Sequence, residues 1–163
     1  MSEHAMRQAI GQVTEDQNRA LDMTMVSTRR HSDLCSLHQE GAREADRYKW
    51  IESEKRGHDV GWHAVNDWYR KHWLRYCREK RIEHVMGQRR WEEFSDNPSS
   101  YVLELIQSND LLFERVLDRL ICDWENLDII AWGVTWGICT KRIISILEEL
   151  DINSARFDPP CSG

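Results

Sequence analysis

The stretch WHAVNDWYRKHWLRYCREKRIEHVMGQRRW, residues 62–91, decides the fold of this chain. Its aromatic and aliphatic side chains recur every three or four residues, which on an α-helix places them within about a third of a turn of one another. The stretch therefore predicts a long amphipathic helix, aromatic on one side and basic on the other. The residues of the aromatic stripe are Trp62, Val65, Tyr69, Trp73, Tyr76 and Cys77.

Turn and break signals on either side of this stretch divide the rest of the chain into helices. A helix is predicted from about residue 32 to 56, ended by Gly57 as a left-handed cap, with Asp59 capping the helix that follows. The clearest break is FSDNPSS, residues 94–100, because a residue before proline disfavours helix. Beyond it we predict helices over 100–107 merging into 111–124, over 127–136, and over 141–150.

These elements predict an all-α fold, a compact bundle of five or six helices in essentially one domain. Only 3 prolines and 8 glycines interrupt the 163 residues, and a chain of this length buries a core without disulfides. We distinguish a polar and adaptable N-terminal segment (1–31), a basic and aromatic two-helix part (32–94), an acidic three-helix part (95–152), and an unstructured tail (153–163).

Cysteine usage and the pattern of apolar residues indicate the compartment. The 5 cysteines are odd in number and form no CxxC pair, which is typical of free thiols in a reducing environment. The N-terminus lacks the layout of a signal peptide, and no stretch approaches the roughly 18 uninterrupted apolar residues of a membrane span. We therefore expect a cytoplasmic protein without a membrane span.

Charge is divided along the chain, beneath a net charge of −6. Residues 70–90 carry eight Lys/Arg and two acids, whereas residues 92–151 carry thirteen acids and four bases. Two interpretations stay open. The two blocks attract each other within the fold or across a dimer, or the basic stripe binds nucleic acid or an acidic protein.

The 8 tryptophans are an excess for this length, and such an excess indicates a dense aromatic core or a surface that binds a partner. Trp68 and Trp91 lie off the stripe, so we expect them at a surface. The leading hypothesis is a non-enzymatic accessory or adaptor subunit of a larger assembly, or a homo-oligomer, since aromatics and arginine anchor interfaces. The residues predicted to bind the partner are Trp68, Arg70, Lys71, Arg75, Arg78, Arg90 and Trp91.

The stretch IIAWGVTWGICTKRIISILEEL, residues 129–150, has the spacing of a helix-turn-helix. Gly133 stands where the first helix would cross the second, Gly137 where the turn falls, and Ile143 among the apolar residues that would fix the second helix. This arrangement resembles the DNA-binding helix-turn-helix families over about twenty residues.

The resemblance implies an alternative function, a DNA-binding transcriptional regulator. Glu148, Glu149 and Asp151 oppose it, because they would repel phosphate. The residues predicted for this alternative are Thr140, which is also expected to cap the second helix, with Lys141, Arg142 and Ser145.

A metal site is the third alternative. His31, Cys35 and His38 are spaced i, i+4, i+7, which on a helix offers three nitrogen or sulfur ligands on one face, although no fourth ligand is evident. No nucleophile, phosphate-loop or metalloprotease motif is present. The chain is therefore expected not to be an enzyme, and no cofactor is predicted.

One more resemblance lies in DRYKWIESEKRGHDVGWHAVNDWYRKHW, residues 46–73. This run looks like a segment of the form HKW-x-x-SEK-x-G-x-D-x-G in uncharacterised bacterial proteins, with Tyr48 in place of the histidine. The resemblance implies a bacterial origin and no particular activity. Physically, the segment is either a joint between two helices or a pocket around Tyr48, Trp50, His58 and Asp59. The matching residues are Lys49, Trp50, Ser53, Glu54, Lys55, Gly57, Asp59 and Gly61.

Overall fold

The helix that carries the aromatic stripe packs on the helix before it, on the last α-helix of the described residues and on the 3-10 helix that follows. In the computed structural model, which describes residues 34–160, this helix is α3 (Trp62–Val85). It buries most of the predicted stripe, although Trp62 at its first turn is exposed. The described residues form an all-α fold, as predicted.

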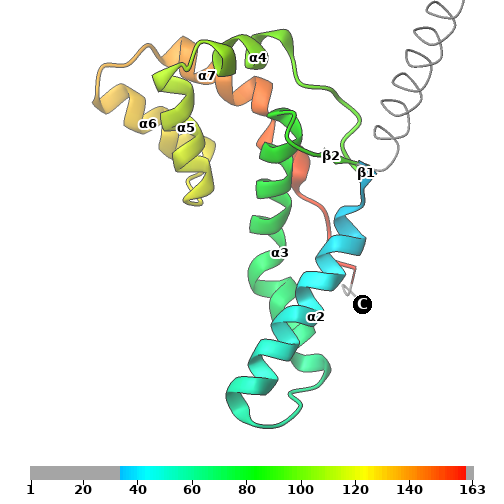
Figure 1. Cartoon of the computed structure of the whole chain (residues 1–163). Helices are drawn as coiled ribbons and strands as arrows, with labels where there is room; N and C mark the ends of the chain where they lie inside the picture. The colour runs from blue at the N-terminus through cyan, green and yellow to red at the C-terminus, as the bar shows by residue number, and fades with distance from the viewer. Residues whose placement is uncertain (1–33, 161–163) are drawn as a thin grey trace, which may run out of the picture. The chain divides into compact units, whose positions relative to one another are not determined.

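Six α-helices lie within residues 34–160, with two short strands that pair with each other and one 3-10 helix (Figure 1). Within this range, none of the helices combines the length and the apolar run that a bilayer crossing requires. In chain order the elements are β1 (Leu34–Cys35), α2 (Leu37–Arg56), α3 (Trp62–Val85), β2 (Arg90–Trp91), α4 (Ser100–Gln107), α5 (Leu111–Ile121), α6 (Asn126–Thr135), α7 (Thr140–Leu150) and η1 (Ile152–Ala155).

The helices α2 and α3 form an antiparallel hairpin with a tight joint (Figure 1). Gly57 ends α2 in the left-handed conformation, at φ +70°, as predicted. Asp59 does not cap α3, because Gly61 holds that position. Instead the Asp59 carboxylate accepts the Gly61 N–H at 2.9 Å within the joint.

The segment with the bacterial resemblance forms this joint. Ser53 Oγ donates to the Lys49 carbonyl at 2.8 Å and accepts the Val60 N–H at 3.2 Å. Lys49 also lies 3.5 Å from the Asp59 carboxylate. These contacts account for the segment as a helix joint. The alternative pocket exists in part, since Trp50, His58 and Asp59 line a shallow hollow there, whereas Tyr48 packs against the aromatic core.

Helix α2 begins later than predicted, at Leu37 instead of about residue 32. Ser36 is its N-cap in an extended conformation, and Cys35 belongs to β1. The Glu93 carboxylate accepts the Leu37 N–H and the Ser36 hydroxyl, both at 2.9 Å. Burial works to raise the pKa of Glu93, but these two hydrogen bonds hold it below its ordinary value.

Two hydrophobic clusters share α3. An aromatic cluster joins α2, the first half of α3, β2 and Phe94, whereas an aliphatic cluster joins the end of α3 to α4–α7. Asn109, at φ +50°, and the cap Asp110 separate α4 from α5, so the predicted merged helix is two helices. The predictions for residues 1–31 lie outside the described residues.

The chain beyond α7 returns to the aromatic cluster, so the prediction of an unstructured tail is wrong for residues 153–157. Ala155 is fully buried. The Phe157 carbonyl accepts the Trp73 indole N–H at 2.9 Å. The centroid of the Phe157 ring lies 5.7 Å from that of the Phe94 ring. The prediction failed because a polar-looking sequence at a chain end is tied down by contacts with distant residues.

Candidate functional site

Trp68 and Trp91 are core residues, so the prediction that they lie at a surface is wrong. Trp68 is 7% exposed and Trp91 is 1% exposed. The reason is that α2 and β2 together cover a wider arc of α3 than one stripe. Trp91 belongs to β2, which packs on α3. Next to it, the Glu92 N–H donates to the Cys35 carbonyl at 2.9 Å.

The predicted basic row is divided between the surface and the interior. Arg78 is buried, donating to Glu125 Oε1 at 3.1 Å and to the Trp124 carbonyl at 2.7 Å. Arg75 lies 3.6 Å from Asp123. These contacts bear out the interpretation that the basic and acidic blocks attract each other within the fold.

The remaining predicted partner residues are exposed. Arg70 and Lys71 both pair with Asp67 of their own helix, at 2.5 Å and 3.0 Å. Arg90 has no ion pair within residues 34–160. The structure thus does not bring the predicted residues together on one open surface.

The three-ligand metal site is not built as predicted. Cys35 precedes α2, so it does not share a helical face with His38, which stacks on Trp73 at 5.5 Å between ring centroids. His31 lies outside the described residues. Among residues 34–160, no cluster of His, Cys, Asp and Glu has an arrangement that would hold a metal ion.

The two helices of the helix-turn-helix prediction are α6 and α7, which pack on each other. A Cβ on Gly133 would lie 2.1 Å from Ile143 Cδ1, so this glycine allows the close crossing, and Gly137 turns the chain at φ +65°. Thr140 is not the cap, because Cys139 holds that position and Thr140 begins the helix. This packing is that of a helical hairpin, and a DNA-binding unit stays a prediction.

The residues predicted to contact DNA are mostly engaged elsewhere. Arg142 pairs with Asp110, and Ser145 Oγ donates to the Lys141 carbonyl at 3.0 Å. Lys141 is exposed and is the one predicted cation at this site with no ion pair in the described part of the chain. Exposed Glu148 and Glu149 follow on the same helix.

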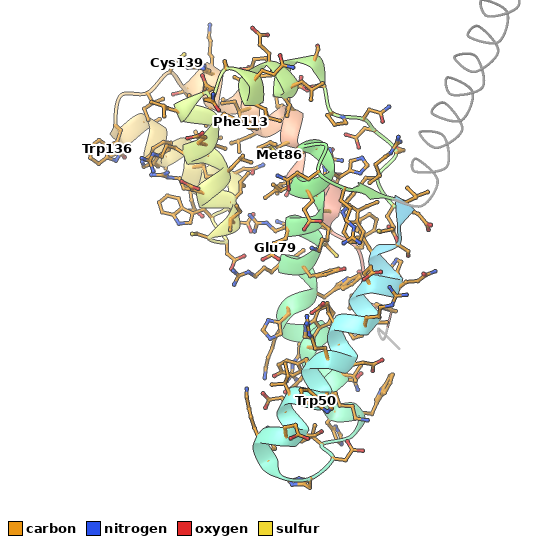
Figure 2. The ribbon with its side chains drawn as sticks, viewed as in Figure 1. Trp50, Glu79, Met86, Phe113, Trp136 and Cys139 are labelled. Atoms are coloured by element: carbon orange, nitrogen blue, oxygen red, sulfur yellow. The ribbon has the colours of Figure 1, made fainter. Side chains whose placement is uncertain are left out.

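A groove along α6 brings three tryptophans together, and the sequence prediction missed it. It has a volume of about 520 Å³. Trp136, at the outer end of α6, is 73% exposed (Figure 2), and Trp124 is 38% exposed. We call it the α6 groove, lined by Asp123, Trp124, Asp128, Ala131, Trp132, Thr135 and Trp136.

Contacts beneath the α6 groove hold its aromatic rings in place. The Arg119 guanidinium lies 3.6 Å from the centre of the Trp132 ring and 5.3 Å from that of Trp124, close enough for cation–π attraction. Buried Arg78 holds the Trp124 carbonyl, and the reciprocal capping bonds of Glu125 and Asp128 fix the start of α6. The groove is therefore built on ordered helix ends.

A sequence signal for the α6 groove exists in the spacing of its residues. Trp124, Asp128, Trp132 and Trp136 recur every four residues, which predicts one shared helical face. Trp132 and Trp136 also fall within the predicted helix-turn-helix, and the exposure of the four residues depends on which face of α6 packs on α7. That choice is not visible in the sequence.

The buried Cys77 thiol of α3 has low reactivity. Burial raises the pKa of Cys77 to about 12, so the nucleophilic thiolate is scarce near neutral pH.

No known protein family, curated protein or solved structure matches this chain.

Proposed function

We propose that this chain is a cytoplasmic, non-enzymatic adaptor that docks a partner protein through the α6 groove. The partner segment that fits is amphipathic, with apolar side chains beside Lys or Arg. The observation that carries the proposal is the exposure of Trp136 beside Trp124 and Trp132 on one face. Free thiols at Cys77, Cys122 and Cys139 support a reducing compartment.

The aromatic content of the α6 groove supports a protein partner. Tryptophan is enriched among the few residues that supply most of the energy of an interface, because it buries a large area with little loss of conformational entropy. Leu127 and Val134 of α6 are also exposed, but they lie outside the lining of the groove. Clusters of exposed apolar side chains with a polar border are typical of interaction sites.

The charges at the α6 groove support a basic partner segment. Asp128 is exposed and has no ion pair within residues 34–160, since its carboxylate accepts only the Glu125 N–H at 3.0 Å. Asp123 forms an ion pair with Arg75 at 3.6 Å, and both side chains are about half exposed. A Lys or Arg beside these carboxylates would be attracted, and this attraction would weaken with added salt.

A site-specific photo-crosslinking experiment in the native cells tests the proposal. A photoreactive residue at Ala131, in the groove, is compared with one at Ala42, which is equally exposed on α2. We expect a protein crosslink from position 131 alone, to a peptide with apolar and basic residues. Trp136→Ser should reduce the yield about tenfold or more, since it removes a central anchor.

Trp50→Ser is the matched control, because Trp50 is an exposed tryptophan on α2. It should leave the crosslink unchanged. The proposal is wrong if position 131 yields no protein, if the captured peptide is acidic, or if both tryptophan variants reduce the yield equally.

A further inference from the structure

Another cavity lies between α2 and α3, and Arg75 in its lining pairs with Asp123 of the α6 groove at 3.6 Å. It has a volume of about 440 Å³, within the range of small-molecule sites. Figure 2 labels Glu79, one of its lining residues, in the second half of α3. We call it the Tyr76 pocket, lined by Glu40, Glu44, Trp68, His72, Arg75, Tyr76, Glu79, Lys80, Arg89 and Trp91.

Two polar groups in the walls of the Tyr76 pocket lack hydrogen-bond partners. The Tyr76 hydroxyl and the Trp91 Nε1–H are buried, and neither finds an acceptor among residues 34–160. Tyr76 is 8% exposed and Trp91 is 1% exposed. A buried donor left unpaired is unfavourable, and few occur in folded proteins. Two in the walls of one cavity therefore point to an acceptor from outside the chain.

Tyr76 is held as a donor under all ordinary conditions. Burial, together with the nearby carboxylates of Glu40 and Glu44, raises the pKa of Tyr76 well above its ordinary value. The hydroxyl thus keeps its proton and can donate it to an acceptor oxygen or nitrogen.

The cations of the Tyr76 pocket lie over its aromatic rings. Lys80 Nζ is 5.4 Å from the centre of the Tyr76 ring and 5.5 Å from that of Trp91. The Arg89 guanidinium is 5.4 Å from the centre of the Trp91 ring. An acceptor that reaches the two buried donors has to pass Lys80, whose four-carbon side chain is flexible.

Most charged side chains of the Tyr76 pocket are paired within the chain, and Arg75 pairs with Asp123 at 3.6 Å as well as with Glu79. Glu40 pairs with Arg43, Glu44 with Arg47 at 3.4 Å, and Glu79 with Arg75 at 3.1 Å. Lys80 pairs with Glu83 at 2.6 Å. Arg89 is exposed and has no ion pair in the described part of the chain.

We propose that the Tyr76 pocket binds a planar aromatic carboxylate. The ring of the ligand would lie against Trp68, Tyr76 and Trp91, while its carboxylate would accept hydrogen bonds from Arg89 and from the two unpaired donors. A carboxylate supplies about four acceptor positions and bonds an arginine through two oxygens, which fits this donor set. This proposal stands independently of the α6 groove.

Three probes with one ring and different charges test the proposal on the full chain. Indole-3-acetate carries a carboxylate, indole is neutral, and tryptamine carries an ammonium group. We expect indole-3-acetate to bind in calorimetry and to shift the Trp91 indole N–H signal in a ¹H–¹⁵N spectrum. That signal is identified by its loss in the Trp91→Phe variant. Tryptamine should bind at least about tenfold more weakly, because an ammonium group meets Arg89 and Lys80 as a like charge.

Arg89→Gln and Arg90→Gln form a matched pair of variants, since both residues are exposed arginines on adjacent positions and only Arg89 lines the pocket. Arg89→Gln should weaken indole-3-acetate binding about tenfold or more, whereas Arg90→Gln should leave it unchanged. Tyr76→Phe keeps the ring and should weaken it several-fold. Thermal unfolding of each variant confirms that it is folded.

The proposal is overturned if none of the three probes binds. It is also overturned if tryptamine binds with the same affinity as indole-3-acetate, because the carboxylates of Glu40, Glu44 and Glu79 would then attract the ligand instead of Arg89. Equal losses in the Arg89 and Arg90 variants, or no shift of the Trp91 signal, would also contradict it.

Discussion

Gly41 sets how closely α2 can approach the aromatic side of α3. A Cβ built on Gly41 would lie 2.5 Å from Trp73 Cζ3 and 3.4 Å from two further ring atoms. The Trp73 ring is 2% exposed, and its N–H is held by the Phe157 carbonyl. A rigid ring held on several sides has no room to move away.

We predict that Gly41→Ala destabilises the protein, although alanine is the better helix former. The clash should cost about 1–3 kcal/mol, which exceeds the roughly 1 kcal/mol that alanine contributes over glycine in a helix. Urea unfolding followed by circular dichroism measures the difference. Ala42→Gly at the exposed neighbouring position measures the propensity effect alone. If the Gly41→Ala variant is more stable than wild type, the prediction is wrong, because the Trp73 ring then shifts at little cost.

His84 joins α3 to the chain after it through both ring nitrogens. Its Nε2 lies 2.5 Å from the Asp96 carbonyl, and its Nδ1 lies 3.2 Å from the Trp91 backbone nitrogen. A carbonyl only accepts and a backbone N–H only donates, so the neutral ring with its proton on Nε2 satisfies both partners. This contact positions Trp91 and hence one wall of the Tyr76 pocket.

At the scale of elements, Arg81 ties three segments together. Its guanidinium donates to both Asp96 carboxylate oxygens, at 2.6 Å and 2.8 Å, and its Nε donates to the Leu150 carbonyl at 3.0 Å. The Arg81 side chain is almost fully buried. Arg81 therefore joins α3 to the segment before α4 and to the end of α7.

We predict that Asp96→Asn destabilises the protein by about 1.5–3 kcal/mol near neutral pH, because it leaves a buried guanidinium without its anion. Asp96 is 49% exposed, so water screens the pair and the lower end of this range is expected. Urea unfolding at neutral pH measures the difference in the free energy of unfolding.

We also predict that the loss of stability caused by Asp96→Asn depends on pH. The hydrogen bond from Arg81 lowers the pKa of Asp96 below its ordinary value of 3.8. Stabilisation by Asp96 is therefore complete above that ordinary value and is lost as the pH falls through the lower value of the folded state. The stability difference between wild type and Asp96→Asn should narrow below pH 3.8. A difference that stays constant down to about pH 2 would contradict this assignment of the carboxylate.

At the scale of the described residues as a whole, α3 couples the aromatic and aliphatic clusters. Its first half belongs to the aromatic cluster, and Ile82 and Val85 belong to the aliphatic one. The 3-10 helix η1 spans the same division, since Ile152 packs in the aliphatic cluster and Ala155 in the aromatic one. The two clusters are therefore expected to unfold together.

We predict that Ile146→Ala, a change confined to the aliphatic cluster, lowers the unfolding midpoint of the aromatic cluster as well. Ile146 is fully buried, and removing its side chain should cost about 2–5 kcal/mol. Near-ultraviolet circular dichroism follows mainly the buried tryptophans Trp68, Trp73 and Trp91, all of the aromatic cluster, and far-ultraviolet circular dichroism follows the helices. The two urea transitions should coincide and shift by the same amount. A near-ultraviolet transition that stays at the wild-type midpoint would show that the clusters unfold separately.

Much of the fold was predictable from local sequence signals. The spacing of Tyr69, Trp73 and Tyr76 predicted α3, Gly57 predicted the end of α2, and Gly133 and Gly137 predicted a close helix crossing and a turn, although not the helix-turn-helix unit itself. The candidate site was not predictable in the same way. Trp68 and Trp91 were expected at the surface, whereas the tryptophans that are more than half exposed are Trp50, Trp62 and Trp136.

Helical periodicity and left-handed glycines act over a few residues, so the amino-acid order alone determined that this chain forms helices and where several of them stop. Which tryptophans are buried was decided only in three dimensions. Burial depends on segments far apart in the chain, such as β2 and the residues after α7, coming together over one side of α3. A side chain's exposure is thus a property of its distant neighbours, and those neighbours are placed by the packing of the whole core.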